Sequence, residues 1–161
     1  LECLKKSNCP LEWIEFHVAE WKNEGGLEKE AATCASLAET AMANGKTAVV
    51  YTSRTVIDLS DQTPEQLLAI SVRISDALTS VVSRLAKRPR FLIAKGGITS
   101  SDVGTIALAV KKARVLGQVQ PGIPVWKIGE ESRFPGMSYI IFPGNVGDED
   151  TLRKIVEVLN R

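Results

Sequence analysis

Residues 95–102 (KGGITSSD) have the residue types that suit a phosphate-binding loop. Two adjacent glycines allow the backbone to approach a ligand without a clash from Cβ atoms. The hydroxyl residues that follow can donate hydrogen bonds, and the free amide groups at the beginning of a helix attract anions. The stretch matches neither the Walker loop nor G-x-G-x-x-G, so a tight turn with a hydroxyl helix cap is the alternative interpretation. The candidate phosphate-binding residues are Gly96, Gly97, Ile98, Thr99, Ser100 and Ser101.

A second candidate loop covers residues 142–147 (FPGNVG) and follows an apolar run. Its glycine and asparagine residues are typical of a turn, which is the simplest interpretation. The three acidic residues at 148–150 would repel a phosphate group. If this loop contacts a nucleotide, we therefore expect Gly144 and Asn145 to lie against the base or the ribose.

A third polar stretch, Thr52, Ser53 and Arg54, follows the apolar run 47–51. Its hydroxyl groups and guanidinium could contact an anion, although an ordinary polar loop is the favoured interpretation. The single histidine, His17, lies in the alternating run 13–18 and is interpreted as a structural residue, because a metal site needs further ligands. The sequence identifies no catalytic residue and no metal site.

Length and composition limit the classes of protein to which the chain can belong. A chain of 161 residues has the length of one domain. Its formal net charge of +1 lacks the basic excess of a nucleic-acid binder, and no apolar run is long enough to span a membrane. The spacing of Cys3, Cys9 and Cys34 fits reduced cytoplasmic thiols better than a disulfide framework or a zinc site. Leu1 and Leu4 share the face of a helix already under way, which suggests a piece of a longer polypeptide.

The candidate loops are separated by strand-like and helix-like segments that alternate along the chain. This alternation predicts an α/β fold, with a mostly parallel sheet flanked by helices on both faces and an antiparallel strand pair near the C-terminus. Ligands of such sheets bind beyond the carboxyl ends of the strands, and we expect Gly96 and Gly97 to follow a central strand, with Ser100 or Ser101 at a helix N-terminus. The expected strands are 13–18, 47–51, 91–94, 125–128 and 139–142. The expected helices are 27–43, 63–88, 101–116 and 148–159.

Taken together, these stretches resemble a known family. Residues 95–102, then 117–126 (GQVQPGIPVW), then 142–147 occur in the order and at the spacing found in the C-terminal nucleotide-binding domain of the four-carbon acid sugar kinases. The stretch 51–54 also fits this pattern, and the resemblance extends from about residue 45 onward. In plants a similar segment occurs in a fusion protein with dehydrogenase-like and class II aldolase-like domains.

The resemblance implies that residues 1–161 form an ATP-binding domain of a cytoplasmic kinase. Its substrate would be a four-carbon sugar acid such as a threonate, an erythronate or a 3-oxo-tetronate. The sugar acid would bind to a separate N-terminal domain that this sequence does not contain, and Mg²⁺ would accompany ATP. By matching position, ATP phosphates would contact Gly96, Gly97, Thr99 and Ser100, and Gly144 would line the nucleotide pocket. Neither nucleic acid nor a membrane is an expected partner.

Two features depart from the family pattern. Phe142 and Pro143 stand where many members have lysine and serine, so a cation is missing near the expected phosphate. The family's first strand and its serine-rich ATP loop precede the region that matches here. We therefore expect this fragment alone to be nearly inactive. The alternative function is a non-catalytic module that senses a nucleotide or a sugar phosphate within a multidomain protein.

Overall fold

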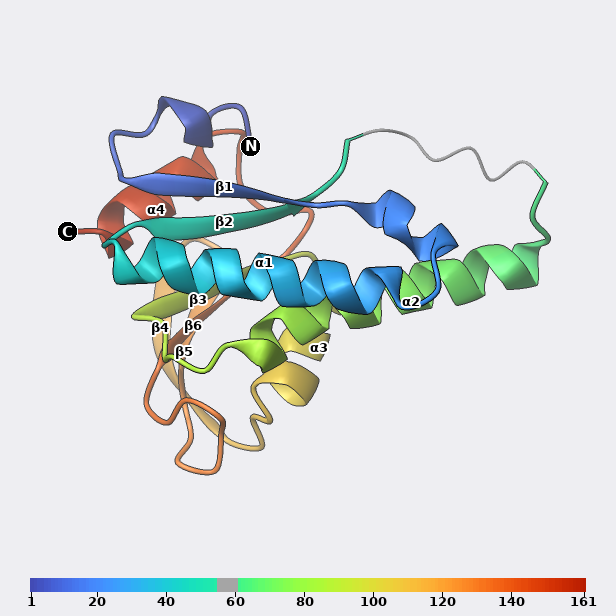
Figure 1. Ribbon diagram of the computed structural model, residues 1–161. Helices are drawn as coiled ribbons and strands as arrows, with labels where there is room; N and C mark the ends of the chain where they lie inside the picture. The colour runs from blue at the N-terminus through green and yellow to red at the C-terminus, as the bar shows by residue number, and fades with distance from the viewer. Residues whose placement is uncertain (55–60) are drawn as a thin grey trace. The chain divides into compact units, whose positions relative to one another are not determined.

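The computed structural model describes residues 1–54 and 61–161 (Figure 1). These residues form two compact units, which are described separately. Unit 1 consists of Leu1–Pro10 together with Lys87–Arg161, and unit 2 consists of Leu11–Ala86.

Unit 2 is built around two parallel strands and the helix that connects them. Strands β1 and β2 pair in parallel along their whole length, and α1 packs on both strands and on α2. The buried face of α1 consists mostly of alanine, whose small side chain allows close packing against its neighbours. The elements are β1 (Leu11–Phe16), the short 3₁₀ helix η2 (Val18–Lys22), α1 (Gly26–Ala43), β2 (Thr47–Thr52) and α2 (Pro64–Arg84).

The beginning of α2 was predictable from local chemistry. The Thr63 side chain accepts a hydrogen bond from the Gln66 amide, and the Gln66 side chain accepts one from the Thr63 amide. Pro64 occupies the first helical position, where its missing N–H costs no hydrogen bond. Thr63 and Gln66 therefore form a capping box, a helix start whose residue types can be recognised in the sequence.

Unit 1 contains a four-stranded sheet in the order β3-β6-β5-β4. Only β3 and β6 are parallel, whereas β6 with β5 and β5 with β4 are antiparallel. The elements are the 3₁₀ helix η1 (Leu4–Lys6), β3 (Phe91–Lys95), α3 (Gly97–Asp102), the π-helix η3 (Val103–Ala107), β4 (Ala113–Gln120), β5 (Ile123–Ile128), β6 (Ser138–Phe142) and α4 (Thr151–Leu159).

Helices pack on both faces of this sheet. On one face, Ile155 of α4 joins a buried cluster with Ile140 and Phe142 of β6. The opposite face presents Tyr139, which is fully buried, and its hydroxyl donates a 2.6 Å hydrogen bond to the Ser100 carbonyl of α3. Gly104 lies against the same ring, because a Cβ there would be 3.3 Å from Tyr139 Cε1. The sheet thus fixes the position of α3 directly.

The predicted fold class is confirmed as α/β, but its arrangement differs from the prediction. The structure has a two-stranded parallel sheet in unit 2 and a mainly antiparallel sheet in unit 1, instead of one mostly parallel sheet. The antiparallel pair near the C-terminus is confirmed as β5 with β6. Strand β3, expected in the centre, lies at the edge of the unit 1 sheet.

The helix expected over 101–116 is correct only as far as Ala107 and wrong beyond it. The helical segment begins earlier, at Gly97, and continues through the π-helix to Ala107. Ala109 then adopts a φ of 52°, a left-handed conformation that ends a right-handed helix. Residues 113–120 form β4, which pairs with β5 across a turn at Gly122. Pairing with β5, a tertiary contact, decides the conformation of this ambiguous segment.

Candidate functional site

The first candidate loop begins where β3 ends. Gly96 has a φ of 113° and a ψ of 145°, a conformation that is accessible essentially only to glycine. Its amide donates a 2.9 Å hydrogen bond to the Phe142 carbonyl, which ties the loop to the end of β6. Gly97 is the first residue of α3, and a Cβ there would meet nothing within 4 Å. The backbone over Gly97 therefore faces open space.

The second candidate loop lies beside the first. Lys95 and Phe142 are paired residues at the carboxyl ends of the parallel strands β3 and β6. Beyond them, a Cβ added at Gly144 would lie 3.9 Å from the Gly96 Cα. The structure thus brings together two glycine loops that are almost fifty residues apart in the sequence. Glycine in both loops leaves their backbones accessible to a shared ligand.

The hydroxyl groups of the first loop have different environments. Ser100 is buried, and its hydroxyl donates a 2.7 Å hydrogen bond to the Ala94 carbonyl. Its side chain therefore has a local structural role. Ser100 and Ser101, one of which was expected at a helix N-terminus, are the fourth and fifth residues of α3, which begins at Gly97. Ser101 is exposed and Thr99 is half-buried, so their hydroxyl groups are the ones available to a ligand. Ile98 is 75% exposed.

The charged groups near these loops are a lysine at the first loop and a group of carboxylates that follows the second loop. The Lys95 ammonium lies over the Phe142 ring, 5.0 Å from its centroid. Among the acidic residues after the second loop, Asp148 accepts hydrogen bonds from the Thr151 hydroxyl and the Asp150 amide, which lower its pKa. Asp150 is paired with Arg153, which lowers the Asp150 pKa. Both carboxyl groups thus remain ionised, and each has a cation beside it: Arg153 for Asp150 and Lys154, at 3.4 Å, for Asp148.

The comparisons with known proteins identify the family. A family model described as a nucleotide-binding C-terminal domain matches residues 1–152. The chain belongs to this family. This family is the nucleotide-binding domain of four-carbon acid sugar kinases, as the motifs at 95–102 and 142–147 predicted.

Solved structures share the fold of this nucleotide-binding domain. It is similar to a domain of unknown function from Bordetella bronchiseptica, a domain-swapped dimer with bound citrate, with 16% identity and a TM-score of 0.68 over 99% of this chain and 37% of that chain. A Haemophilus influenzae protein has 23% identity and a TM-score of 0.61, over 98% of this chain and 36% of its own. A Salmonella typhimurium protein provisionally described as a tRNA synthase has 19% identity and a TM-score of 0.63, over 93% and 34%.

The chain spans little more than a third of the length of these structures. No curated protein sequence matches it.

Within residues 1–54 and 61–161, no helix combines the length and the apolar character that crossing a membrane requires.

The third candidate stretch of the nucleotide-binding domain lies in unit 2, at the carboxyl end of β2. The Ser53 amide and hydroxyl both donate to the Phe16 carbonyl, at 3.0 and 3.2 Å, and the Ser53 hydroxyl accepts a 3.4 Å hydrogen bond from the Val18 amide. Ser53 therefore links the ends of β1 and β2. Thr52 and Arg54 are exposed, and their contact with an anion stays a prediction.

Histidine 17 has an environment that the sequence did not reveal. His17 follows the end of β1 instead of lying within a strand, and its side chain is 59% exposed. Its Nδ1 is 2.6 Å from Glu30 Oε1, and its amide donates a 2.8 Å hydrogen bond to the same oxygen. The hydrogen bond with Glu30 raises the His17 pKa. The two residues are thirteen positions apart, so no local motif indicates the pair.

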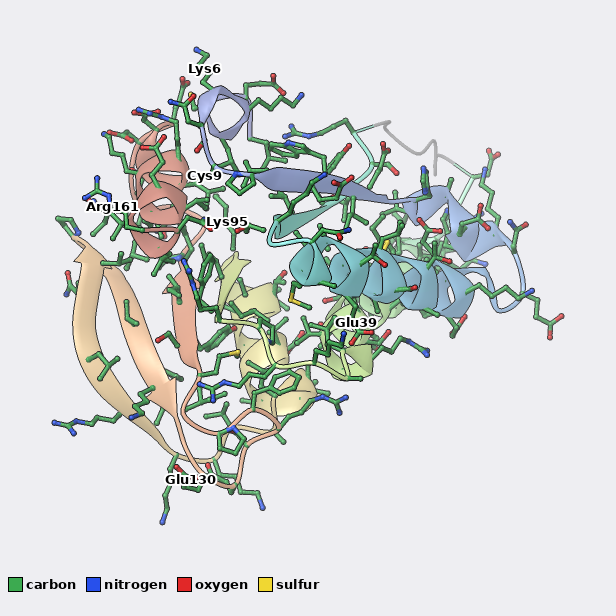
Figure 2. All side chains as sticks on the ribbon, turned by 60° about the vertical axis from the view of Figure 1, so that its left-hand side comes forward. Lys6, Cys9, Glu39, Lys95, Glu130 and Arg161 are labelled. Carbon is green, nitrogen blue, oxygen red and sulfur yellow. The ribbon has the colours of Figure 1, made fainter. Side chains whose placement is uncertain are left out.

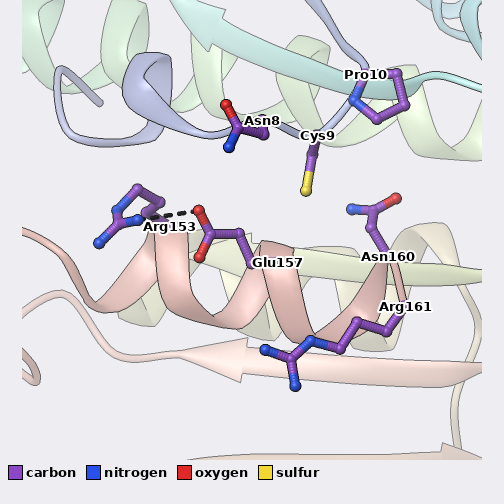
Figure 3. A pocket seen from close by; sticks show the side chains of 7 residues that line it. All are labelled: Asn8, Cys9, Pro10, Arg153, Glu157, Asn160 and Arg161. Atoms are coloured by element: carbon purple, nitrogen blue, oxygen red, sulfur yellow. Dashed lines mark hydrogen bonds and ion pairs between the residues drawn. The ribbon is translucent and has the colours of Figure 1, made fainter.

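A hollow of about 500 Å³ lies elsewhere in unit 1, between the N-terminal segment and the end of α4 (Figure 3). One side of it carries the 3.0 Å ion pair between Arg153 and Glu157. The residues lining the hollow are Asn8, Cys9, Pro10, Arg153, Glu157, Asn160 and Arg161. None of them was a candidate site residue, so this hollow is separate from the two glycine loops.

Proposed function

We propose that this domain binds ATP and that the protein containing it phosphorylates a four-carbon sugar acid of the threonate, erythronate or 3-oxo-tetronate type. The observation that carries the proposal is the meeting of two glycine loops at the carboxyl ends of β3 and β6. The match to a nucleotide-binding family supports the choice of ligand class. The choice of sugar acid follows from the resemblance alone.

In this proposal the ATP phosphates lie over Gly96 and Gly97, where the first turn of α3 offers free amide groups and the backbone faces open space. Thr99 and Ser101 supply accessible hydroxyl groups. Gly144 and Asn145 contact the adenosine portion. The three carboxylates at 148–150 outnumber the cations Arg153 and Lys154 paired with them, and the remaining negative charge disfavours a phosphate at the second loop. Each of these contacts is consistent with the positions of the two loops.

The distribution of charge favours an anionic ligand on unit 1. Unit 1 contains fourteen lysine and arginine residues and eight aspartate and glutamate residues, whereas unit 2 contains six and eleven. Although the overall net charge is only +1, unit 1 is therefore basic, and unit 1 carries both glycine loops. A local excess of positive charge raises the rate at which an anion such as ATP associates.

Phosphoryl transfer depends on positioning and on neutralising the phosphate charge. Mg²⁺ would enter bound to the phosphates and to water, as is usual for this ion, and the hydroxyl groups of Thr99 and Ser101 are oxygen donors that fit it. When bound, Mg²⁺ would neutralise charge on the transferring group. The residues of this domain orient the phosphate chain, and the sugar acid binds in a part of the protein outside this sequence.

A non-catalytic nucleotide-sensing module is the second candidate. The observation that favours it is Phe142, whose apolar ring lies at the end of β6 next to the loops. Many members of the family have a lysine at this position, so a cation that could assist phosphate transfer is missing. The two functions differ in turnover, because a sensor binds ATP without transferring its phosphate to any tetronate.

The test uses the full-length protein and two substitutions at one position, Gly97→Ala and Gly97→Val. Neither new side chain meets an atom within 4 Å of its Cβ, so both variants should fold normally, as checked by circular dichroism. We expect Gly97→Val to abolish ATP binding in calorimetry and Gly97→Ala to weaken it less, because the larger side chain fills the space of the phosphate. Unchanged ATP affinity in a folded Gly97→Val variant would falsify the loop assignment.

Activity is measured on the full-length protein with a panel of threonate, erythronate and 3-oxo-tetronate substrates. ATP consumption that depends on one of these acids supports the kinase. ATP binding without turnover on any of them supports the sensing module.

A further inference from the structure

Lys95 is a lysine placed directly beside the candidate site. It is the last residue of β3 and precedes Gly96. Its side chain is exposed at the end of the strand (Figure 2). Because Lys95 and Phe142 are register partners, their side chains project from the same face of the sheet.

The aromatic ring of Phe142 restricts where the Lys95 ammonium can lie. The ammonium is 5.0 Å from the ring centroid, within the range of a cation–π contact. Phe142 itself is 2% exposed and packs in the buried cluster with Ile123, Ile140 and Ile155. A rigid ring thus provides a fixed support for a flexible lysine side chain.

Lys95 and Phe142, the residues that carry the ammonium and the ring, adjoin the backbone where the two glycine loops meet. The Phe142 carbonyl accepts the Gly96 hydrogen bond, and Gly144 approaches Gly96 two residues beyond Phe142. Lys95 and Phe142 are therefore the first residues of the two loops, 95–102 and 142–147.

Other cations near the second loop are already paired with carboxylates. Arg153 forms ion pairs with Asp150 and Glu157, and Lys154 lies 3.4 Å from Asp148 and 3.8 Å from Asp150. For Lys95, the described part of the chain contains no carboxylate within ion-pair distance. Its charge is available to a ligand.

We propose that Lys95 is the cation that binds the phosphate chain of the nucleotide, and that Phe142 is the residue that positions it. This inference rests on the proposed ATP site. The positive charge of Lys95 would raise the affinity for ATP, which carries phosphate groups, and leave the affinity for adenosine unchanged.

The test compares three variants of the full-length protein by calorimetry with ATP and with adenosine. Lys95→Met removes the charge and keeps most of the side-chain length. Lys95→Arg keeps the charge, and Lys112→Met is the matched control at another exposed lysine of unit 1. Loss of a charge-assisted hydrogen bond predicts that Lys95→Met weakens ATP about ten- to one-hundred-fold and changes adenosine affinity less than about two-fold. Lys95→Arg should retain most of the ATP affinity, and Lys112→Met all of it.

A fourth variant, Phe142→Leu, examines the positioning role. It keeps an apolar residue in the core but removes the ring, so ATP affinity should fall by less than in Lys95→Met. The double variant, which combines Lys95→Met and Phe142→Leu, should bind ATP no more weakly than Lys95→Met alone, because Phe142 acts through the lysine. Additive losses would show that the ring has an independent effect and would overturn the positioning role.

The outcomes separate this inference from the proposed function. If Gly97→Val abolishes ATP binding while Lys95→Met leaves it unchanged, the ATP site stands and the role of Lys95 is refuted. If Lys95→Met weakens adenosine as much as ATP, the lysine does not contact phosphate, and the inference is likewise refuted. If the unmodified protein binds no ATP at millimolar concentration, the proposed function fails and the inference fails with it.

Discussion

The pair formed by His17 and Glu30 should make the stability of unit 2 depend on pH. Glu30 Oε1 accepts a backbone hydrogen bond from His17 and lies 2.6 Å from the His17 imidazole. Glutamine at position 30 keeps a carbonyl oxygen for the backbone amide but removes the charge. Alanine removes both interactions. The two substitutions therefore separate the pH-dependent part of the contact from the constant part.

The His17 pKa is raised, first by its hydrogen bond with Glu30 and further by the charges of Glu30, Glu15 and Glu20, while desolvation opposes the rise. A raised pKa in the folded state means that protonated His17 stabilises the fold at pH values below its unfolded pKa of about 6.5. This stabilisation disappears as pH rises through the folded pKa.

The magnitude follows from the exposure of the two side chains, which is 59% for His17 and 15% for Glu30. An exposed ion pair contributes about 0.2–1 kcal/mol, and a backbone hydrogen bond about 0.5–1.5 kcal/mol. Glu30→Gln should therefore cost about 0.5 kcal/mol at pH 5.5 and almost nothing at pH 9. Glu30→Ala should cost about 1 kcal/mol at pH 9 and more at pH 5.5.

Urea unfolding of the 161-residue chain at both pH values measures these differences. The histidine is unique in the sequence, so NMR resonances of one imidazole report its pKa without assignment ambiguity. Glu28→Gln, at an exposed position in the same helix, is the control and should leave the His17 pKa nearly unchanged. Equal costs of Glu30→Gln at pH 5.5 and pH 9, or an unaltered His17 pKa, would refute the electrostatic reasoning.

Three further predictions concern the glycine loops. Gly96→Ala should lower the free energy of unfolding by about 1–3 kcal/mol, because the φ of 113° strains any residue with a Cβ; a loss below 0.5 kcal/mol in urea unfolding would contradict this. Ser100→Ala should reduce stability by about 1–2 kcal/mol through loss of its buried bond to Ala94, as measured by thermal melting, and an unchanged melting temperature would show that this bond contributes little. Asn145→Ala should weaken ATP and adenosine by similar factors, about 1 kcal/mol each, in calorimetric titration of the full-length protein. A loss for ATP alone would place phosphate at the second loop.

Local signals in the sequence predicted most of the elements. The capping box at Thr63 and Gln66 needs only four consecutive residues, and the apolar runs at 47–51 and 91–94 each correspond to a strand in the structure. The capping box was recognisable because its hydrogen bonds lie within the helix end itself. The two runs were recognisable because a short apolar run is typical of a strand packed in a core. The predicted fold class followed from the alternation of such elements.

Strand pairing and exposure explain why the sequence did not reveal the conformation of residues 113–120. Residues 113–120 were assigned to a helix, yet they form β4 because β5 is available as a partner. Val115 and Leu116 of β4 are 63% and 54% exposed, so burial does not impose the alternating pattern by which strands are recognised.

In the candidate site, too, some features could be recognised from local residues, whereas others depend on how the strands pair. The two glycine loops were each recognisable from their residues, and their order along the chain identified the family. That Lys95 lies over Phe142 depends on the parallel register of β3 and β6, which neither strand encodes alone. The sequence showed an apolar residue at position 142 but not the cation held beside it.

The hydrogen bond from the Tyr139 hydroxyl to the Ser100 carbonyl has a consequence for the thermodynamics of binding. It anchors the first turns of α3 to the fully buried interior of unit 1, and the burial of Tyr139 raises its pKa, which keeps the hydroxyl protonated as a donor. The amide groups above Gly97 are therefore oriented before a ligand arrives. An incoming anion loses little affinity to ordering of the loop, since preorganisation reduces the entropy cost of association.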